Sequence, residues 1–169
     1  DAQESRGLGD VYKRQKFNKQ VNERFDEIGV QPTFFWNINK NIAIGPSIYY
    51  NSVAGYSERF SAKFTLSNSR VLFVVIPSIA HSHQTDAGYA EGFAQLQFNI
   101  PIKSKLSLWF NGQFLTVWDT FKTHSRSFQQ LRSGVSFNGH QFGIGMDFDQ
   151  YGPKPIEKSS FGLYYRKTL

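Results

Sequence analysis

Hydrophobic and polar residues alternate with a period of two along most of this chain, most regularly over residues 131–148. Because successive side chains of a strand point to opposite faces of a sheet, this alternation predicts strands with one apolar and one polar face. If Gly139 and His140 form a two-residue turn, residues 131–148 fold into a hairpin. Arg132 then lies opposite Asp147 on the polar face of that hairpin.

The same alternation predicts nine strands in an antiparallel meander. They cover residues 26–38, 42–51, 60–67, 71–83, 89–102, 106–119, 128–138, 141–151 and 159–168. Short turns near residues 39–41, 68–69, 103–105 and 139–140 alternate with longer polar loops near residues 52–59, 84–88, 120–127 and 151–159. Short turns at one end and long loops at the other are typical of an up-and-down transmembrane β-barrel, in which residue 169 then lies at the short-turn end. Since bacterial single-chain barrels have even strand numbers, we expect about nine or ten strands here and a barrel truncated at its N-terminus.

Composition supports an all-β chain. The 17 Phe, 8 Tyr and 3 Trp stand against a single Met, and aromatic residues favour strands. The chain lacks cysteine, which excludes disulfides and thiolate metal sites, and it has no run of 18 apolar residues that would form a membrane-spanning helix. The net charge of +6 fits an anionic partner, but no basic cluster is dense enough to predict nucleic-acid binding.

The N-terminal segment requires separate treatment. Residues 5–15, SRGLGDVYKRQ, resemble the translation of a sequencing adapter at the end of a metagenomic fragment. We therefore interpret residues 1–15 as an artefactual or disordered leader and residues 16–25 as a residual loop or partial strand. Residues 26–169 are predicted to form one β-barrel domain. The missing signal peptide then carries no information on location.

The last strand places Phe161, Leu163, Tyr165 and Leu169 at alternate positions, interrupted by Lys167. In this pattern and in the meander of residues 26–169, the chain resembles bacterial outer-membrane β-barrel proteins and is similar to the small barrels of Bacteroidota-type bacteria. Lys167 and the terminal Leu depart from the usual pattern of the final strand. The resemblance implies a porin-like protein in the Gram-negative outer membrane that contacts membrane lipids and lipopolysaccharide. It also implies that the outer-membrane assembly machinery recognises the C-terminal strand.

In such a barrel the apolar face meets lipid and the polar face lines the lumen. The candidates for lumen-lining residues are Lys63, Glu91, Gln95, Gln97, Asn111, Gln113, Gln130, Arg132, Asp147 and Asp149. They either set the field along a passive pore for small solutes or fill a narrow barrel as an internal network in which Arg132 pairs with Asp147. Neither role requires a cofactor.

Two further sets of residues belong to this interpretation. Aromatic residues near strand ends predict girdles at the membrane interfaces, namely Trp36, Tyr50, Phe60, Trp118 and Tyr165. Loop residues that either contact lipopolysaccharide or carry ordinary solvated charge are Tyr56, Arg59, Asp119, Lys122, Arg126, Tyr151, Lys154 and Lys158.

Two alternatives remain open. A soluble lipocalin-like barrel would turn the apolar face inward around a small apolar ligand. A lipid-modifying outer-membrane hydrolase would need a Ser, a His and a carboxylate, and His81 and His83 flank Ser82. Because neighbouring residues of a strand face opposite ways, Ser82 does not share a space with these histidines, and two histidines are an incomplete metal site. His124 and Ser125 lie together on another predicted loop, but we assign no catalytic residue and expect no enzyme.

Overall fold

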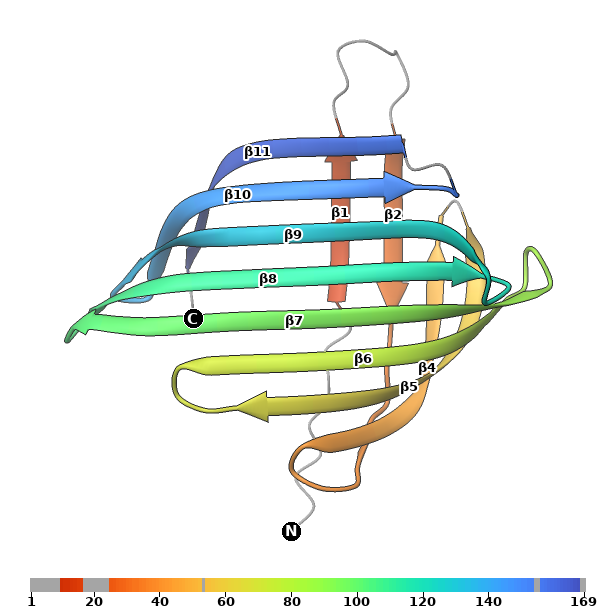
Figure 1. Cartoon of the computed structure of the whole chain (residues 1–169), viewed down its shortest axis with the longest axis horizontal. Helices are drawn as coiled ribbons and strands as arrows, with labels where there is room; N and C mark the ends of the chain where they lie inside the picture. Colours follow the sequence, from red (N-terminus) through yellow and green to blue (C-terminus); the bar gives the residue numbers. More distant parts are fainter. Residues whose placement is uncertain (1–9, 17–24, 53, 154–155, 168–169) are drawn as a thin grey trace.

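The computed structural model describes residues 10–16, 25–52, 54–153 and 156–167, which form one antiparallel β-sheet (Figure 1). The strands are β1 (Asp10–Lys16), β2 (Phe25–Gln31), β3 (Trp36–Asn37), β4 (Ile42–Asn51), β5 (Gly55–Ser67), β6 (Val71–Ser82), β7 (Ala87–Lys103), β8 (Leu106–Asp119), β9 (Thr123–Phe137), β10 (His140–Tyr151) and β11 (Ile156–Lys167). The described part of the chain contains no helix that is long and apolar enough to cross a membrane.

The strands follow one another in the sheet in the order of the sequence. The path runs β1-β2-β4-β5-β6-β7-β8-β9-β10-β11, and the short strand β3 pairs with β4 beside this path. The predicted all-β, antiparallel up-and-down architecture is therefore confirmed. Within the described residues, β1 pairs only with β2 and β11 only with β10.

The first predicted strand, residues 26–38, is divided in two. β2 ends at Gln31, directly before Pro32, which has no N–H group to donate to a ladder. An isolated bridge between Thr33 and Ser47 continues the contact with β4 before β3 begins. β1 lies partly within the residues that we interpreted as a leader, and that interpretation stays a prediction.

Several strands begin earlier than the alternation of hydrophobic residues predicted. β5 begins at Gly55 rather than at residue 60, and β9 begins at Thr123 rather than at residue 128. The predicted long loops near residues 52–59 and 120–127 are therefore wrong, since most of their polar residues continue the strands. The connections at the two ends of the sheet consequently differ little in length. The prediction that one end carries the short turns and residue 169, and the other the long loops, therefore loses most of its support.

The hairpin of β9 and β10 turns one residue earlier than predicted. Asn138 and Gly139 have φ angles of 51° and 81°, the backbone that a type I′ turn requires, so Phe137 lies opposite His140. This register differs from the predicted one by two positions. Because a shift of two preserves the alternation, every side chain of the hairpin stays on its predicted face.

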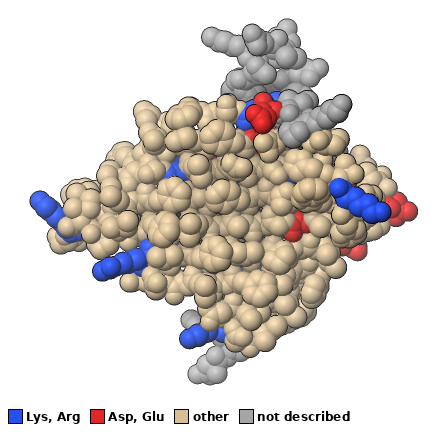
Figure 2. Space-filling model, viewed as in Figure 1, with Lys and Arg blue, Asp and Glu red and all other residues tan. Residues whose placement is uncertain are grey.

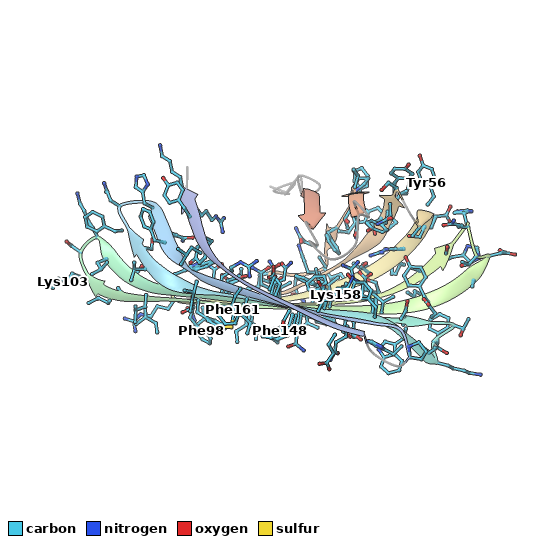
Figure 3. The ribbon with its side chains drawn as sticks, turned by 90° about the horizontal axis from the view of Figure 1, so that it is seen from above. Tyr56, Phe98, Lys103, Phe148, Lys158 and Phe161 are labelled. Carbon is cyan, nitrogen blue, oxygen red and sulfur yellow. The ribbon has the colours of Figure 1, made fainter. Side chains whose placement is uncertain are left out.

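Seen from above, the sheet bends into a trough, with β1 and β2 curling over its open side (Figure 3). Phe98 and Phe148 lie on the outer side of this trough and Lys158 lies on its inner side. We name these sides the convex and the concave face. A row of register partners across β7 to β10 defines each face: Ala94, Phe114, Gln129 and Phe148 for the convex face, and Gln95, Gln113, Gln130 and Asp147 for the concave face.

Burial on the two faces is the reverse of that in a soluble protein. Many large apolar side chains of the convex face are exposed, from 36% at Phe148 to 89% at Leu163. The others include Ile48, Tyr50, Phe60, Phe64, Leu66, Phe73, Ile79, Ile100, Leu108, Phe114, Val135, Phe137, Phe142, Ile144 and Phe161. Figure 2 shows this face as a largely uncharged surface whose Lys, Arg, Asp and Glu residues lie mostly around its margin.

The buried side chains on the concave face are mainly polar. Among the described residues, the buried polar set is Ser47, Asn51, Ser57, Arg59, Ser61, Ser78, Asn111, Gln141 and Asp149, whereas the buried hydrophobic set is Ala43, Ala80 and Trp109. The register also places a row of half-buried apolar residues on this face, Ile76, Phe93, Leu115 and Phe128. The interior of the trough therefore combines buried polar groups joined by hydrogen bonds with a smaller apolar patch.

Candidate functional site on the concave face

All of the sequence-predicted lumen residues lie on the concave face. Cross-strand register arranges most of them in two neighbouring rows, Gln95-Gln113-Gln130-Asp147 and Gln97-Asn111-Arg132. These rows run across β7 to β10 near the middle of the strands. The strands thus bring amide and charged groups from separate parts of the sequence to one polar surface.

Arg59 and Glu91 form a short ion pair at one end of this surface. Arg59 Nη1 donates a hydrogen bond to Glu91 Oε1 at 2.6 Å, and their side chains are only 6% and 12% exposed. The pair spans from β5 to β7 and therefore crosses β6. Ser78 and Ala80, the concave-face residues of β6 at this level, are small enough to leave room for the Arg59 side chain.

Aromatic rings hold the Arg59 guanidinium in place. Its central carbon lies 4.5 Å from the centroid of the Tyr49 ring and 5.6 Å from that of Tyr89. Tyr89 in turn donates its hydroxyl hydrogen to Ser57 Oγ at 2.8 Å. Cation–π contacts of a desolvated guanidinium are each worth on the order of 2 kcal/mol.

The prediction that Arg59 is a loop residue is wrong. It lies inside β5, and its side chain is buried on the concave face. Sequence reasoning placed the start of β5 five residues too late. The signal was available, since Ser57, Arg59, Ser61 and Lys63 continue the polar half of the alternation.

A second ion pair joins Arg132 to Asp147, as the sequence predicted for these two residues. Arg132 Nη1 donates to Asp147 Oδ1 at 2.7 Å, although the two residues are diagonal rather than directly opposite. Gly145 is the direct partner of Arg132, and a Cβ atom there would lie 3.0 Å from Arg132 Cδ and Nε. The missing side chain of Gly145 thus provides the space in which Arg132 reaches Asp147.

Arg126, Tyr151 and Lys158 also belong to strands, so the prediction that they are loop residues is wrong. They lie in β9, β10 and β11. Arg126 Nη2 lies 3.9 Å from Oδ1 of Asp149, which is 2% exposed. The central guanidinium carbon of Arg126 lies 5.2 Å from the centroid of the Tyr151 ring, and Nζ of Lys158 lies 5.6 Å from it. Of the other predicted loop residues, Tyr56 lies in β5, Asp119 ends β8 and Lys122 lies between β8 and β9, whereas Lys154 is outside the described residues.

The aromatic residues predicted for membrane interfaces are exposed on the convex face, by 40% to 65% of their surface. Trp36, Tyr50, Trp118 and Tyr165 lie at or near strand ends, whereas Phe60 lies well inside β5 because that strand begins at Gly55. Tyr56 lies nearer that end of β5, and its ring centroid is 4.7 Å from that of Tyr50.

The two histidines beside Ser82 do not form a catalytic or metal site with it. His81 lies opposite Glu58 on the convex face, whereas Ser82 lies opposite Ser57 on the concave face. His83 Nε2 lies 3.2 Å from Glu58 Oε1. In the part of the chain that the structure describes, no three His, Asp or Glu residues come together to hold a metal ion.

Comparison of the chain with protein-family models, with curated proteins and with solved structures gives no match.

Proposed function

We propose that this chain is an integral outer-membrane β-barrel protein whose convex face contacts lipid and whose concave face lines a narrow polar lumen. The lumen serves as a passive path for small solutes and requires no cofactor. One observation carries the proposal: exposed side chains on the convex face are large and apolar, while buried side chains on the concave face are mostly polar. Soluble proteins show the opposite arrangement.

The extent of the apolar surface supports contact with a membrane. Exposed apolar residues occur on β4 through β11, whereas monomeric soluble proteins rarely expose contiguous apolar patches larger than a few hundred Å². Strands β4 to β11 have between 10 and 17 residues, and a tilted strand crosses the hydrocarbon layer with about 9–11. The aromatic residues near the strand ends suit the two interfaces.

The concave face argues against a lipocalin-like barrel. A lipocalin-like protein would bury apolar side chains around its ligand and expose polar ones. Here the charged side chains of Arg59 and Asp149 are buried on this face. The two ion pairs, Arg59 with Glu91 and Arg132 with Asp147, support a lumen that is narrowed by side chains.

The location is tested with the purified full chain. We expect it to remain folded only in detergent or lipid and to change its electrophoretic mobility when heated, as folded membrane barrels do. A monodisperse protein that stays soluble without detergent and shows no heat-dependent shift would contradict the proposal and favour the lipocalin-like alternative.

The lumen is tested by conductance in planar bilayers. We expect a small conductance for the unmodified chain and a larger one for Arg132→Ala, because the substitution removes a long side chain and its ion pair from the lumen. Leu163→Val, on the convex face, is the control and leaves conductance unchanged. Equal conductance in Arg132→Ala and the unmodified chain would show that Arg132 does not line the solute path.

A further inference from the structure

A polar notch interrupts the apolar convex face near the end of β8 at which Asp119 lies. Thr116 lies opposite Ser127, and Ser127 lies opposite Gln150, so three polar residues form a row across β8, β9 and β10. All three are half-buried. A row of neighbouring polar side chains on a face that is mostly apolar points to a function beyond contact with lipid.

A β-bulge brings His124 into this notch. In the pairing of β8 with β9, Val117 lies opposite Arg126 but Trp118 lies opposite His124, so Ser125 is an extra residue. Residues three apart on a regular strand face opposite sides, and the bulge cancels that alternation. His124 therefore shares the convex face with Ser127 and not with its sequence neighbour Ser125.

The two ring nitrogens of His124 have different partners. Nε2 lies 2.8 Å from Ser127 Oγ, and Nδ1 lies 2.9 Å from the carbonyl oxygen of Gly152. Because a carbonyl oxygen can only accept, the neutral ring carries its hydrogen on Nδ1 and directs the Nε2 lone pair at the Ser127 hydroxyl. This is the tautomer that a general base acting on a serine requires.

Neighbouring side chains position this pair. The His124 ring packs edge-on against Trp118, with 5.6 Å between the centroids. Thr116 Oγ1 accepts a hydrogen bond from Trp118 Nε1 at 2.9 Å and lies 3.1 Å from Ser127 Oγ. Thr116 competes for the single hydroxyl hydrogen of Ser127, but His124 Nε2 is both closer and more basic.

An open groove with a volume of about 400 Å³ has Ser127 in its wall. Its convex-face lining combines apolar and amide residues: Val75, Pro77, Ala94, Phe114, Gln129 and Gln150. The apolar residues suit a hydrocarbon chain. The amide N–H groups of Gln129 are donors of the kind that stabilise an oxyanion, whereas Gln150 Nε2 donates to Glu157 Oε1 at 3.3 Å.

We propose that Ser127 and His124 form the nucleophile and general base of a site that hydrolyses carboxylic esters of membrane lipids, with the acyl chain in this groove. The ester substrate class rests on the membrane location proposed above. The site goes beyond the passive function and departs from our sequence-based expectation of no catalysis. Trp118, 42% exposed beside the pair, suits the lipid–water boundary, where both lipid and water reach Ser127.

The reaction needs only water as a second reactant. Ser127 Oγ attacks the ester carbonyl carbon while its proton passes to His124 Nε2. The bond between the carbonyl carbon and the alkoxy oxygen then breaks, and the alcohol leaves with the proton from His124. Water attacks the acyl-Ser127 with His124 again taking a proton, and the carboxylic acid leaves as Ser127 Oγ regains its hydrogen.

The test uses the full chain folded in detergent micelles and in phospholipid vesicles. We expect a fluorophosphonate probe to label Ser127, and the protein to hydrolyse p-nitrophenyl esters and release fatty acid from the vesicles. Ser127→Ala loses labelling, and Ser127→Ala and His124→Ala each lose hydrolysis by at least about a hundredfold. Ser125→Ala is the matched control and keeps both, since Ser125 lies in the same bulge without contacting the reacting atoms.

The outcomes separate this site from the membrane proposal. A protein that shows the heat-dependent shift but neither labelling nor hydrolysis overturns the catalytic site and leaves the barrel intact. Labelling with hydrolysis of p-nitrophenyl esters but not of vesicle phospholipid overturns the lipid substrate. A chain that folds without detergent overturns the location on which the substrate class depends.

Discussion

The convex and concave faces belong to the same strands, yet one step along a strand separates opposite environments. In β11, Leu163 is 89% exposed on the convex face, whereas its neighbour Tyr164 is half-buried on the concave face with its ring 5.8 Å from that of Trp109. The backbone sorts side chains into two groups by alternation alone. The two groups differ in the surroundings that they favour, which we propose to be lipid for the convex face and a polar lumen for the concave face. Substitutions on one face at a time test this difference.

The largest expected effect comes from breaking the buried ion pair of the concave face. Arg59→Met leaves the Glu91 carboxylate without its partner, and we expect a loss of about 3–5 kcal/mol in the free energy of unfolding. Urea unfolding in lipid vesicles, followed by tryptophan fluorescence, measures this loss. Glu58→Gln, which removes the exposed pair with His83 on the convex face, is the control and loses less than about 1 kcal/mol. Equal losses in the two variants would mean that water reaches the Arg59 pair freely.

A charge placed on the convex face should be nearly as damaging. Ile144→Arg brings a guanidinium into the hydrocarbon layer, and we expect it to lower the free energy of unfolding from vesicles by about 2–4 kcal/mol. Gln113→Arg, on the concave face, is the matched control and has a smaller effect because its charge lies in the polar lumen. If Ile144→Arg instead improved solubility in water without loss of stability, the convex face would be a water-exposed surface.

A smaller effect separates crowded from open positions within the concave face. A Cβ atom at Gly143 would overlap the Ser133 carbonyl oxygen, whereas a Cβ atom at Gly162 meets nothing within 4 Å. We expect Gly143→Ala to cost about 1–3 kcal/mol in the same unfolding experiment. Gly162→Ala should change stability by no more than about 0.5 kcal/mol. Similar losses at both positions would contradict the close approach of β9 and β10 at Gly143.

The alternation of hydrophobic residues was sufficient to predict the fold class and, for the residues that it assigned to strands from β4 to β11, the face on which each lies. It tolerated an error in register, because choosing the turn Gly139-His140 instead of Asn138-Gly139 moved the hairpin by two positions and not by one. It also predicted the contact between Arg132 and Asp147, since a long side chain reaches a diagonal partner as well as a direct one.

Strand ends and irregular positions could not be predicted in this way. Arg59 and Arg126 were placed in loops because the apolar half of the alternation weakens near them, although the polar half continues into β5 and β9. The pairing of His124 with Ser127 depends on the bulge at Ser125, and a bulge changes which residues share a face without leaving a period in the sequence.

The strand order also has a consequence for how the sheet is built. In the described residues, each strand pairs with one that is adjacent or nearly adjacent in the sequence, from β1 to β11. Contacts between sequence neighbours require little loop closure and form quickly. We therefore expect the sheet to grow by one hairpin at a time, with each new strand adding to the edge of the strand before it. The order of strands along the chain is then also the order in which they can assemble.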